Sequence, residues 1–188
     1  MVGSGTGIAP FRSFWQQRQY DILHHNEVEF GETFLFYGCR NKFENIYSRE
    51  LEDAKSQGAL TGVFVGCSRL PVGSKTYVQN LIKLNSKLVL ENLWKKQGHI
   101  YICGNATMAS DVQNTIINIL MESLKCSEHD CKQLIYELKK NGRYHEDVFG
   151  VTLNIVHINQ LIKSLSGVCH ILLDLFDLLC NIIKKKFL

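Results

Sequence analysis

Short apolar runs alternate with longer amphipathic stretches along most of this chain, and this alternation limits the fold more than any other feature. The apolar runs are rich in β-branched and aromatic residues, which is typical of buried strands. They lie at residues 33–37, 63–66, 99–103 and 147–153. The stretches between them have apolar residues at helical spacing, at residues 10–24, 46–57, 76–96, 107–125 and 129–140. The pattern predicts an α/β fold built on a doubly wound parallel sheet of about five strands.

The composition is that of an ordinary globular protein. Its 188 residues carry a formal net charge of +3, which is too small for the basic surface that nucleic acid binding requires. Seven cysteines are scattered without a Cys-x-x-Cys pair, and no apolar signal segment begins the chain. These features predict a cytoplasmic protein with free thiols and no nucleic acid partner.

A glycine-rich turn, GSGTGIAPF at residues 3–11, directly opens the first predicted helix. Its alternate glycines leave backbone N–H groups open at a helix amino end, where a pyrophosphate binds readily, and Thr6 adds a hydroxyl donor. Ile8 replaces the third glycine of the dinucleotide fingerprint, and a merely flexible turn is the alternative. Only Met1 and Val2 precede the turn, whereas a buried strand has about five residues. We therefore expect a truncated first strand and further polypeptide upstream.

A second polar group follows the apolar run at residues 63–66. Ser68, Arg69, Lys75 and Tyr77 offer a hydroxyl, a guanidinium, an ammonium and an aromatic ring. Such groups suit a dianionic phosphate beside an adenine base, whereas a protein that selects NADH usually offers a carboxylate at this place. The sequence therefore favours NADPH, and a solvated basic loop is the alternative.

Five motifs together resemble the NADPH-binding half of the diflavin reductases, and within them the nitric oxide synthases. They are GSGTGIAPFRSFW (3–15), FYGCRN (36–41), CSR with Lys75 and YVQ (67–79), HIYICGNATMASDV (99–112) and GRYHEDVFGVTL (142–153). The resemblance covers residues 1–153 and implies a ferredoxin-reductase-like nucleotide domain. By the same resemblance the chain is a C-terminal fragment of an NADPH-dependent flavoprotein oxidoreductase.

The resemblance also implies roles for single residues. Gly5, Thr6 and Gly7 correspond to the pyrophosphate turn. The ribose phosphate and adenine correspond to Ser68, Arg69, Lys75, Tyr77 and Gln79. The residues implied in hydride transfer are Cys103 beside the nicotinamide, Asp147 as the carboxylate that stabilises its developing charge, and Phe149 as the ring that covers the flavin.

The cofactors and partners follow from the same resemblance. NADPH is expected to reduce an FAD bound largely by upstream domains, and FMN and haem are expected only in the full-length enzyme. The isolated chain is not expected to be active alone. A cytochrome-serving diflavin reductase and a non-catalytic nucleotide-binding or interaction module are the alternatives.

Three features do not fit that pattern. Asn105 stands where the family usually has an aspartate, and Asn154 where the synthases usually have an arginine. Cys126, His129 and Cys131 are close in sequence, but a structural zinc needs a fourth ligand and none is near, so no metal is predicted.

The segment 154–188 forms a separate tail beyond the domain at 1–153. Within it, residues 168–183 are apolar apart from a narrow polar stripe at helical spacing, which predicts an amphipathic helix. Two central aspartates argue against a membrane span. The stretch 168–186 could cover a domain face, contact a partner, lie on a membrane surface or be a non-native end.

Overall fold

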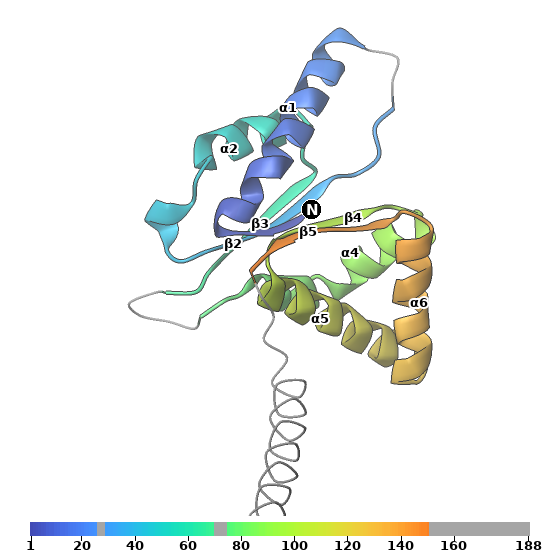
Figure 1. The fold of residues 1–188 in the computed structure, drawn as a ribbon. Helices are drawn as coiled ribbons and strands as arrows, with labels where there is room; N and C mark the ends of the chain where they lie inside the picture. The colour runs from blue at the N-terminus through green and yellow to red at the C-terminus, as the bar shows by residue number, and fades with distance from the viewer. Residues whose placement is uncertain (26–28, 70–74, 151–188) are drawn as a thin grey trace, which may run out of the picture. The chain divides into compact units, whose positions relative to one another are not determined.

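Five parallel strands form the centre of the structure, a computed structural model that describes residues 1–25, 29–69 and 75–150 (Figure 1). The strands are β1 Val2–Ser4, β2 Phe34–Cys39, β3 Gly62–Cys67, β4 Ile100–Asn105 and β5 Tyr144–Phe149. Their order in the sheet is β3-β2-β1-β4-β5, so β1 lies in the middle and the chain winds outward from it in both directions. The predicted doubly wound parallel sheet is therefore confirmed.

Helices cover both faces of this sheet (Figure 1). On one face lie α1 Ala9–His24 and α2 Ser48–Ser56. On the other lie α3 Val78–Leu84, α4 Ser86–Leu90, α5 Ala106–Leu124 and α6 Glu128–Lys140. Three short turns of other helical types complete the fold: η1 Gly5–Ile8, η2 Lys42–Glu44 and η3 Glu91–Lys95. Within the described ranges no helix is long and apolar enough to cross a membrane.

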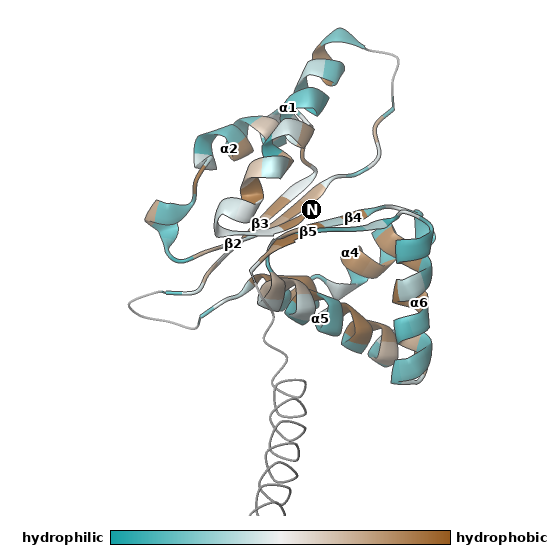
Figure 2. Cartoon of the chain, viewed as in Figure 1, coloured by the Kyte–Doolittle hydropathy of each residue, from teal (hydrophilic) through white to brown (hydrophobic). Residues whose placement is uncertain are grey.

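The two faces of the sheet have separate hydrophobic cores because side chains alternate along each strand. Leu35 and Tyr37 of β2 pack with Trp15 of α1, and all three are fully buried. Phe36 and Ile102 point the other way and pack with Ile116 of α5. Figure 2 shows hydrophobic residues on parts of the sheet and also on helices such as α4 and α5, whereas the outer parts of α6 are hydrophilic. The central strands β1, β2 and β4 are thus largely buried, as in other parallel sheets.

Two differences from the sequence prediction are larger than two residues. The expected helix at 76–96 is three pieces, α3, α4 and η3. The break between α3 and α4 lies at Asn85, whose side chain donates a hydrogen bond to the Leu81 carbonyl (2.8 Å) and whose backbone leaves helical geometry. The last strand begins at Tyr144 instead of residue 147, since Tyr144 is buried and pairs with Ile100. Asn154, the predicted strand end at residue 153 and the predicted helix at 168–183 lie outside the described residues.

The turn after β1 packs against the neighbouring strand β4 at Gly7. A Cβ at this position would lie 2.1 Å from the Cys103 carbonyl oxygen and 2.6 Å from its carbon. Backbone atoms cannot move aside as a flexible side chain can. The absence of a Cβ at Gly7 therefore allows η1 to sit directly on β4.

The substitution Gly7→Ala is expected to destabilise the protein by about 3 kcal/mol, because overpacking against backbone forces η1 away from β4. Denaturant unfolding of the two proteins gives the difference. Gly31→Ala is the matched control, since a Cβ at Gly31 meets nothing within 4 Å. Equal stability changes in the two variants would contradict this account of the close contact.

Candidate functional site

A cavity of about 730 Å³ opens at the carboxyl edge of the sheet, around the ends of β1, β2 and β4. In open parallel sheets ligands bind at this edge, where the strand order reverses. Here the reversal lies at β1, between β2 and β4. The lining residues come from the ends of β1, β2, β4 and β5, from η1 and η2, from the segment between β3 and α3, and from the first turns of α3 and α5. They are Ser4, Gly5, Thr6, Gly38, Cys39, Arg40, Glu44, Ser68, Thr76, Tyr77, Val78, Gln79, Asn105, Thr107, Met108, Asp111 and Phe149.

The predicted phosphate turn forms one wall of this cavity. Gly5 and Thr6 line it and are exposed, and they belong to η1, which runs into α1. Gly5 has φ +55°, and a Cβ there would meet no protein atom within 4 Å. Gly7, the third predicted residue, is buried on Cys103 and is not among the lining residues. The turn therefore presents an open glycine and a hydroxyl to the cavity.

The second predicted group lies at the opposite wall. Ser68, Tyr77 and Gln79 line the cavity. Backbone hydrogen bonds hold the end of β3 beside that of β2, from Ser68 N to Cys39 O (2.9 Å) and from Arg69 N to Arg40 O (2.6 Å). These bonds place the residues after β3 at the same edge of the sheet as the end of β2.

The two predicted cations are exposed and lie next to this wall. Arg69 follows Ser68, and Lys75 precedes Thr76, which also lines the cavity. Neither cation is itself a lining residue. Residues 70–74, which join them, lie outside the described part of the chain.

The three residues predicted for hydride transfer lie on β4 and β5. Cys103 pairs with Asp147 in the sheet, and the Cys103 thiol donates to Asp147 Oδ2 over 3.9 Å. Burial raises the pKa of the Cys103 thiol, and the Asp147 carboxylate adds to that effect. Phe149 pairs with Asn105, lines the cavity and is 52% exposed. A protonated thiol, a carboxylate and an uncovered aromatic ring thus lie along the ends of two adjacent strands.

The sequence analysis assigned no role to several polar lining residues, among them Arg40, Glu44, Thr107 and Asp111. Arg40 follows β2, and its Nε lies 4.0 Å from Glu44 Oε2. Thr107 and Asp111 lie in the first turns of α5, where Asp111 Oδ2 accepts a hydrogen bond from Gln79 Nε2 (3.3 Å). The position of Arg40 directly after a predicted strand was a usable signal, because that is where ligands bind. No such signal marks Thr107, Asp111 or Glu44. They lie in helical segments, where the direction of a side chain depends on how the helix packs against the sheet.

Cys39 also lines the cavity, as a buried thiol at the end of β2. Its sulfur lies 3.7 Å from that of Cys67, the paired residue of β3. Burial, together with the neighbouring thiol, raises the pKa of Cys39 to about 12. Cys39 therefore stays protonated at neutral pH and serves as a wall of the cavity.

Asn105, which departs from the usual aspartate, is the N-cap of α5. Its Oδ1 accepts a hydrogen bond from the Met108 N–H at 2.7 Å. An amide oxygen makes this bond as a carboxylate would, without the charge. Asn105 therefore still caps α5, and it brings less negative charge to the cavity than an aspartate would.

Comparison with known proteins places this chain in a family. The family model for the oxidoreductase NAD-binding domain matches residues 1–114. The chain is 43% identical over 153 residues to the inducible nitric oxide synthase of Gallus gallus and 42% identical over 152 residues to that of Homo sapiens. It is 38% identical over 160 residues to the nitric oxide synthase of Anopheles stephensi. The first two matches cover 80% of this chain and the third 85%, while the chain spans 13% of the length of each relative.

Replacing Asn105 by alanine is expected to destabilise the protein by about 1 kcal/mol, because the Met108 N–H loses its acceptor at the start of α5. Asn105→Asp is the control and should retain most of the stability, since a carboxylate accepts the same hydrogen bond. Thermal unfolding followed by circular dichroism compares the three proteins. If the aspartate variant lost as much stability as the alanine variant, the cap would not be the cause.

Proposed function

Because the chain belongs to the oxidoreductase NAD-binding domain family, we propose that its carboxyl-edge cavity binds NADPH and that β4 and β5 present the nicotinamide to a flavin. One observation carries this proposal. Gly5 and Thr6 of the glycine turn, Ser68 and Tyr77 after β3, and Phe149 of β5 line the same cavity, although they are far apart in the sequence.

The glycine turn suits a pyrophosphate. The open space in front of Gly5 is where a Cβ would otherwise project, and Thr6 offers a hydroxyl beside it. A phosphate at this place would face the amino ends of η1 and α1 and could approach the backbone closely. Gly5 and Thr6 would thus hold the diphosphate, while Gly7 fixes the turn on β4.

The wall formed by Ser68 and Tyr77 suits the ribose phosphate and the adenine. The Ser68 hydroxyl donates to the Cys39 carbonyl (3.3 Å) and would turn this donor to the phosphate when the nucleotide binds. Arg69 and Lys75 would contribute positive charge from their exposed positions at the rim of the cavity. Tyr77 is 46% exposed, which leaves its ring free to lie against a base. Arg40 adds a third cation beside them.

Bound NADPH would supply the hydride, and the residues at the ends of β4 and β5 would orient the nicotinamide. The Asp147 carboxylate would stabilise the positive charge that develops on the ring, because charge formed in the transition state is best stabilised by a group already in place. Cys103 remains a neutral thiol and holds the carboxylate side chain by its S–H donor. Phe149 can cover a planar ring and exclude water from it, since half of its surface is free.

The remaining parts of the reaction would belong to other domains. The chain spans 13% of the relatives that it matches, so we propose that an upstream domain binds most of the FAD and is the partner of this one. FMN and haem would belong to the same full-length enzyme, with nitric oxide synthesis as the overall activity. The names of the relatives support this assignment over a cytochrome-serving reductase. A cytoplasmic location remains a prediction from the cysteine pattern.

Calorimetry with NADPH and NADH tests the phosphate contacts. We expect tighter binding of NADPH, and the double variant Arg69→Ala, Lys75→Ala should weaken NADPH binding roughly tenfold or more, since each charge-assisted bond contributes about 1.5–3 kcal/mol. Binding of NADH should not change. Lys87→Ala is the control, because Lys87 is an exposed lysine of α4. Equal affinity for the two nucleotides, or equal losses for both, would refute NADPH selectivity.

Stopped-flow measurement of flavin reduction tests Asp147. In a chimera where residues 1–150 replace the matching segment of the chicken synthase, Asp147→Asn should slow flavin reduction by NADPH roughly tenfold, the effect of about 1.4 kcal/mol in the barrier. The dissociation constant of NADPH should stay within about twofold, a change of about 0.4 kcal/mol. A loss of affinity as large as the loss of rate would show that Asp147 binds the nucleotide instead.

A further inference from the structure

Two cysteines lie in contact at the corner between α5 and α6. The sulfurs of Cys126 and Cys131 are 2.7 Å apart, and both residues carry free thiols. Figure 1 shows this corner, where α5 ends beside the start of α6. The sequence shows only that the two cysteines are five residues apart, whereas the fold brings their side chains together.

The start of α6 explains why the two thiols meet. Ser127 is the N-cap and forms a capping box with Asp130, in which the Asp130 N–H donates to Ser127 Oγ (3.2 Å) and the Ser127 N–H donates to Asp130 Oδ2 (3.3 Å). Cys126 directly precedes the cap, and Cys131 is the fourth residue of the helix. Apolar side chains at these two positions pack together as a hydrophobic staple. Here both are cysteines, which behave as small apolar residues while they are reduced.

The end of α5 fixes the corner from the other side. Lys125 has φ +51°, and its N–H donates to the Met121 carbonyl (3.0 Å), so α5 ends directly before Cys126. The Cys131 N–H donates to the Ser127 carbonyl (3.1 Å). Backbone hydrogen bonds therefore hold both ends of this short segment. Closing the gap between the sulfurs to an S–S bond of about 2.05 Å requires a shift of less than about 1 Å.

The two thiols differ in their access to solvent. Cys126 is half-buried, whereas Cys131 is fully buried. Cys131 belongs to the hydrophobic core that includes Ile135 and Leu138 of the same helix. Burial, together with the neighbouring thiol, raises the pKa of Cys131 to about 11. A dissolved oxidant can therefore reach Cys126, and Cys131 can react only with the sulfur beside it.

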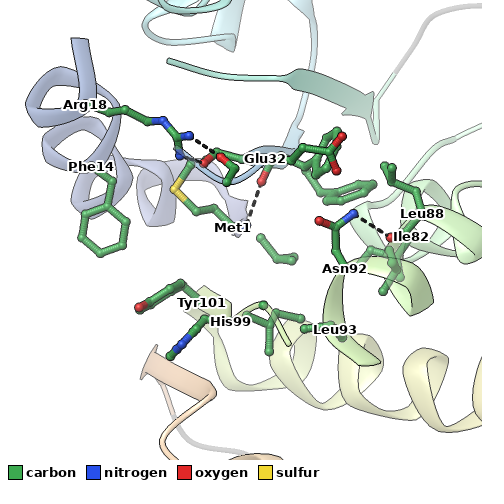
Figure 3. Close-up of a pocket in the computed structure, with 18 residues that line it drawn as sticks. Met1, Phe14, Arg18, Glu32, Ile82, Leu88, Asn92, Leu93, His99 and Tyr101 are labelled. Carbon is green, nitrogen blue, oxygen red and sulfur yellow. Dashed lines mark hydrogen bonds between the residues drawn. The ribbon is translucent and has the colours of Figure 1, made fainter. Parts of the chain in front are cut away.

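Neither a metal nor a cavity accounts for the pair. A structural zinc ion has four ligands, and within the described ranges no three or more His, Cys, Asp or Glu side chains are grouped to hold an ion. Neither cysteine lines the nucleotide cavity. Neither lines a second cavity, of about 420 Å³, which Figure 3 shows around the beginnings of β2 and β4. The pair is thus a site of its own.

We propose that Cys126 and Cys131 are a redox modification site, at which a small-molecule disulfide such as oxidised glutathione converts the two thiols into one reversible disulfide. In the first exchange, the Cys126 thiolate attacks a sulfur of the oxidant, whose S–S bond breaks and releases one glutathione thiolate. In the second exchange, the Cys131 thiolate attacks the Cys126 sulfur and releases the other glutathione thiolate. The protein loses two electrons and two protons, and the oxidant gains them as two glutathione thiols. Excess reduced glutathione reverses both exchanges.

A second pair of neighbouring thiols, Cys39 and Cys67, provides a comparison. Their sulfurs are 3.7 Å apart and belong to paired residues of β2 and β3. Backbone hydrogen bonds hold these two strands in register, among them the bond from Ser68 N to Cys39 O (2.9 Å). Joining the two sulfurs would require strands of the sheet to move, whereas Cys126 lies in a turn between helices. We therefore expect Cys126 and Cys131 to be oxidised first.

Titration of the full chain with mixtures of oxidised and reduced glutathione tests the site. Trypsin cleaves after Lys125 and after Lys132, so one peptide, CSEHDCK, contains both cysteines of the pair and no other. The disulfide makes this peptide lighter by two hydrogen atoms, and alkylation before digestion marks the thiols that remain. We expect the disulfide within this peptide at glutathione ratios where Cys39 and Cys67 are still alkylated. A glutathione that stays attached to Cys126, or oxidation of both pairs at the same ratio, would overturn the proposal.

The same titration in concentrated urea separates the effect of the fold from that of the short spacing in the sequence. Two cysteines five residues apart can form a disulfide in an unfolded chain as well. Because the folded corner already holds the thiols together, the equilibrium constant for oxidation should be about tenfold larger, or more, in the folded chain. Oxidation then stabilises the folded state by the same factor and should raise the melting temperature by roughly 3 °C or more. Equal constants in the folded and the unfolded chain would overturn the proposal.

Single variants assign the response to the pair. Cys126→Ser removes the half-buried thiol and leaves the core at Cys131 intact, so oxidised glutathione should neither oxidise Cys131 nor raise the melting temperature. Cys67→Ser is the matched control, because it replaces a half-buried cysteine outside the pair and should keep both responses. A rise in melting temperature that persists in Cys126→Ser would assign the effect to other cysteines and overturn the proposal.

Discussion

The central position of β1 is the constraint on which the rest of the structure depends. β1 is paired on both sides, so both neighbouring strands fix where it ends. The turn that follows β1 therefore lies between β2 and β4, where the strand order reverses. That turn can sit close to β4 only because Gly7 has no side chain toward the Cys103 carbonyl. The same contact leaves Gly5 and Thr6 facing the cavity. Packing and binding thus use neighbouring residues of one turn for different purposes.

The electrostatics of the nucleotide cavity follow from which groups are paired inside it. Asp111 is engaged by Gln79, and Glu44 accepts from the Asn41 side chain (2.8 Å) and lies near Arg40. Both carboxylates at the cavity therefore have partners of the protein's own. An uncharged amide caps α5 at Asn105. The Thr6 hydroxyl, the open backbone at Gly5 and the rim cations face an anionic ligand, which is the balance that a phosphate-rich nucleotide needs.

Much of this arrangement could be predicted from the sequence, because hydrophobic periodicity reports which elements are buried and the order of strands and helices restricts their connections. The parallel sheet of about five strands follows from that order, whereas the register that pairs Cys103 with Asp147 does not. The break at Asn85 depends on a side chain competing with the helix backbone, and periodicity does not register such competition. Arg40 and Asp111 reach the cavity through tertiary packing of β2 and α5. The different fates of Gly5 and Gly7 depend on a contact with β4, which no local pattern contains.

The place where β1 ends sets the position of the phosphate turn. β1 has three residues, of which two pair with β4 and three with β2. Ladder bonds and buried side chains act on this one short segment, and together they fix its direction. Gly5 follows directly after Ser4, the last residue of β1, so its position is set by where the strand ends. The pairing of β1 with both of its neighbours therefore positions Gly5 and Thr6 at the nucleotide cavity.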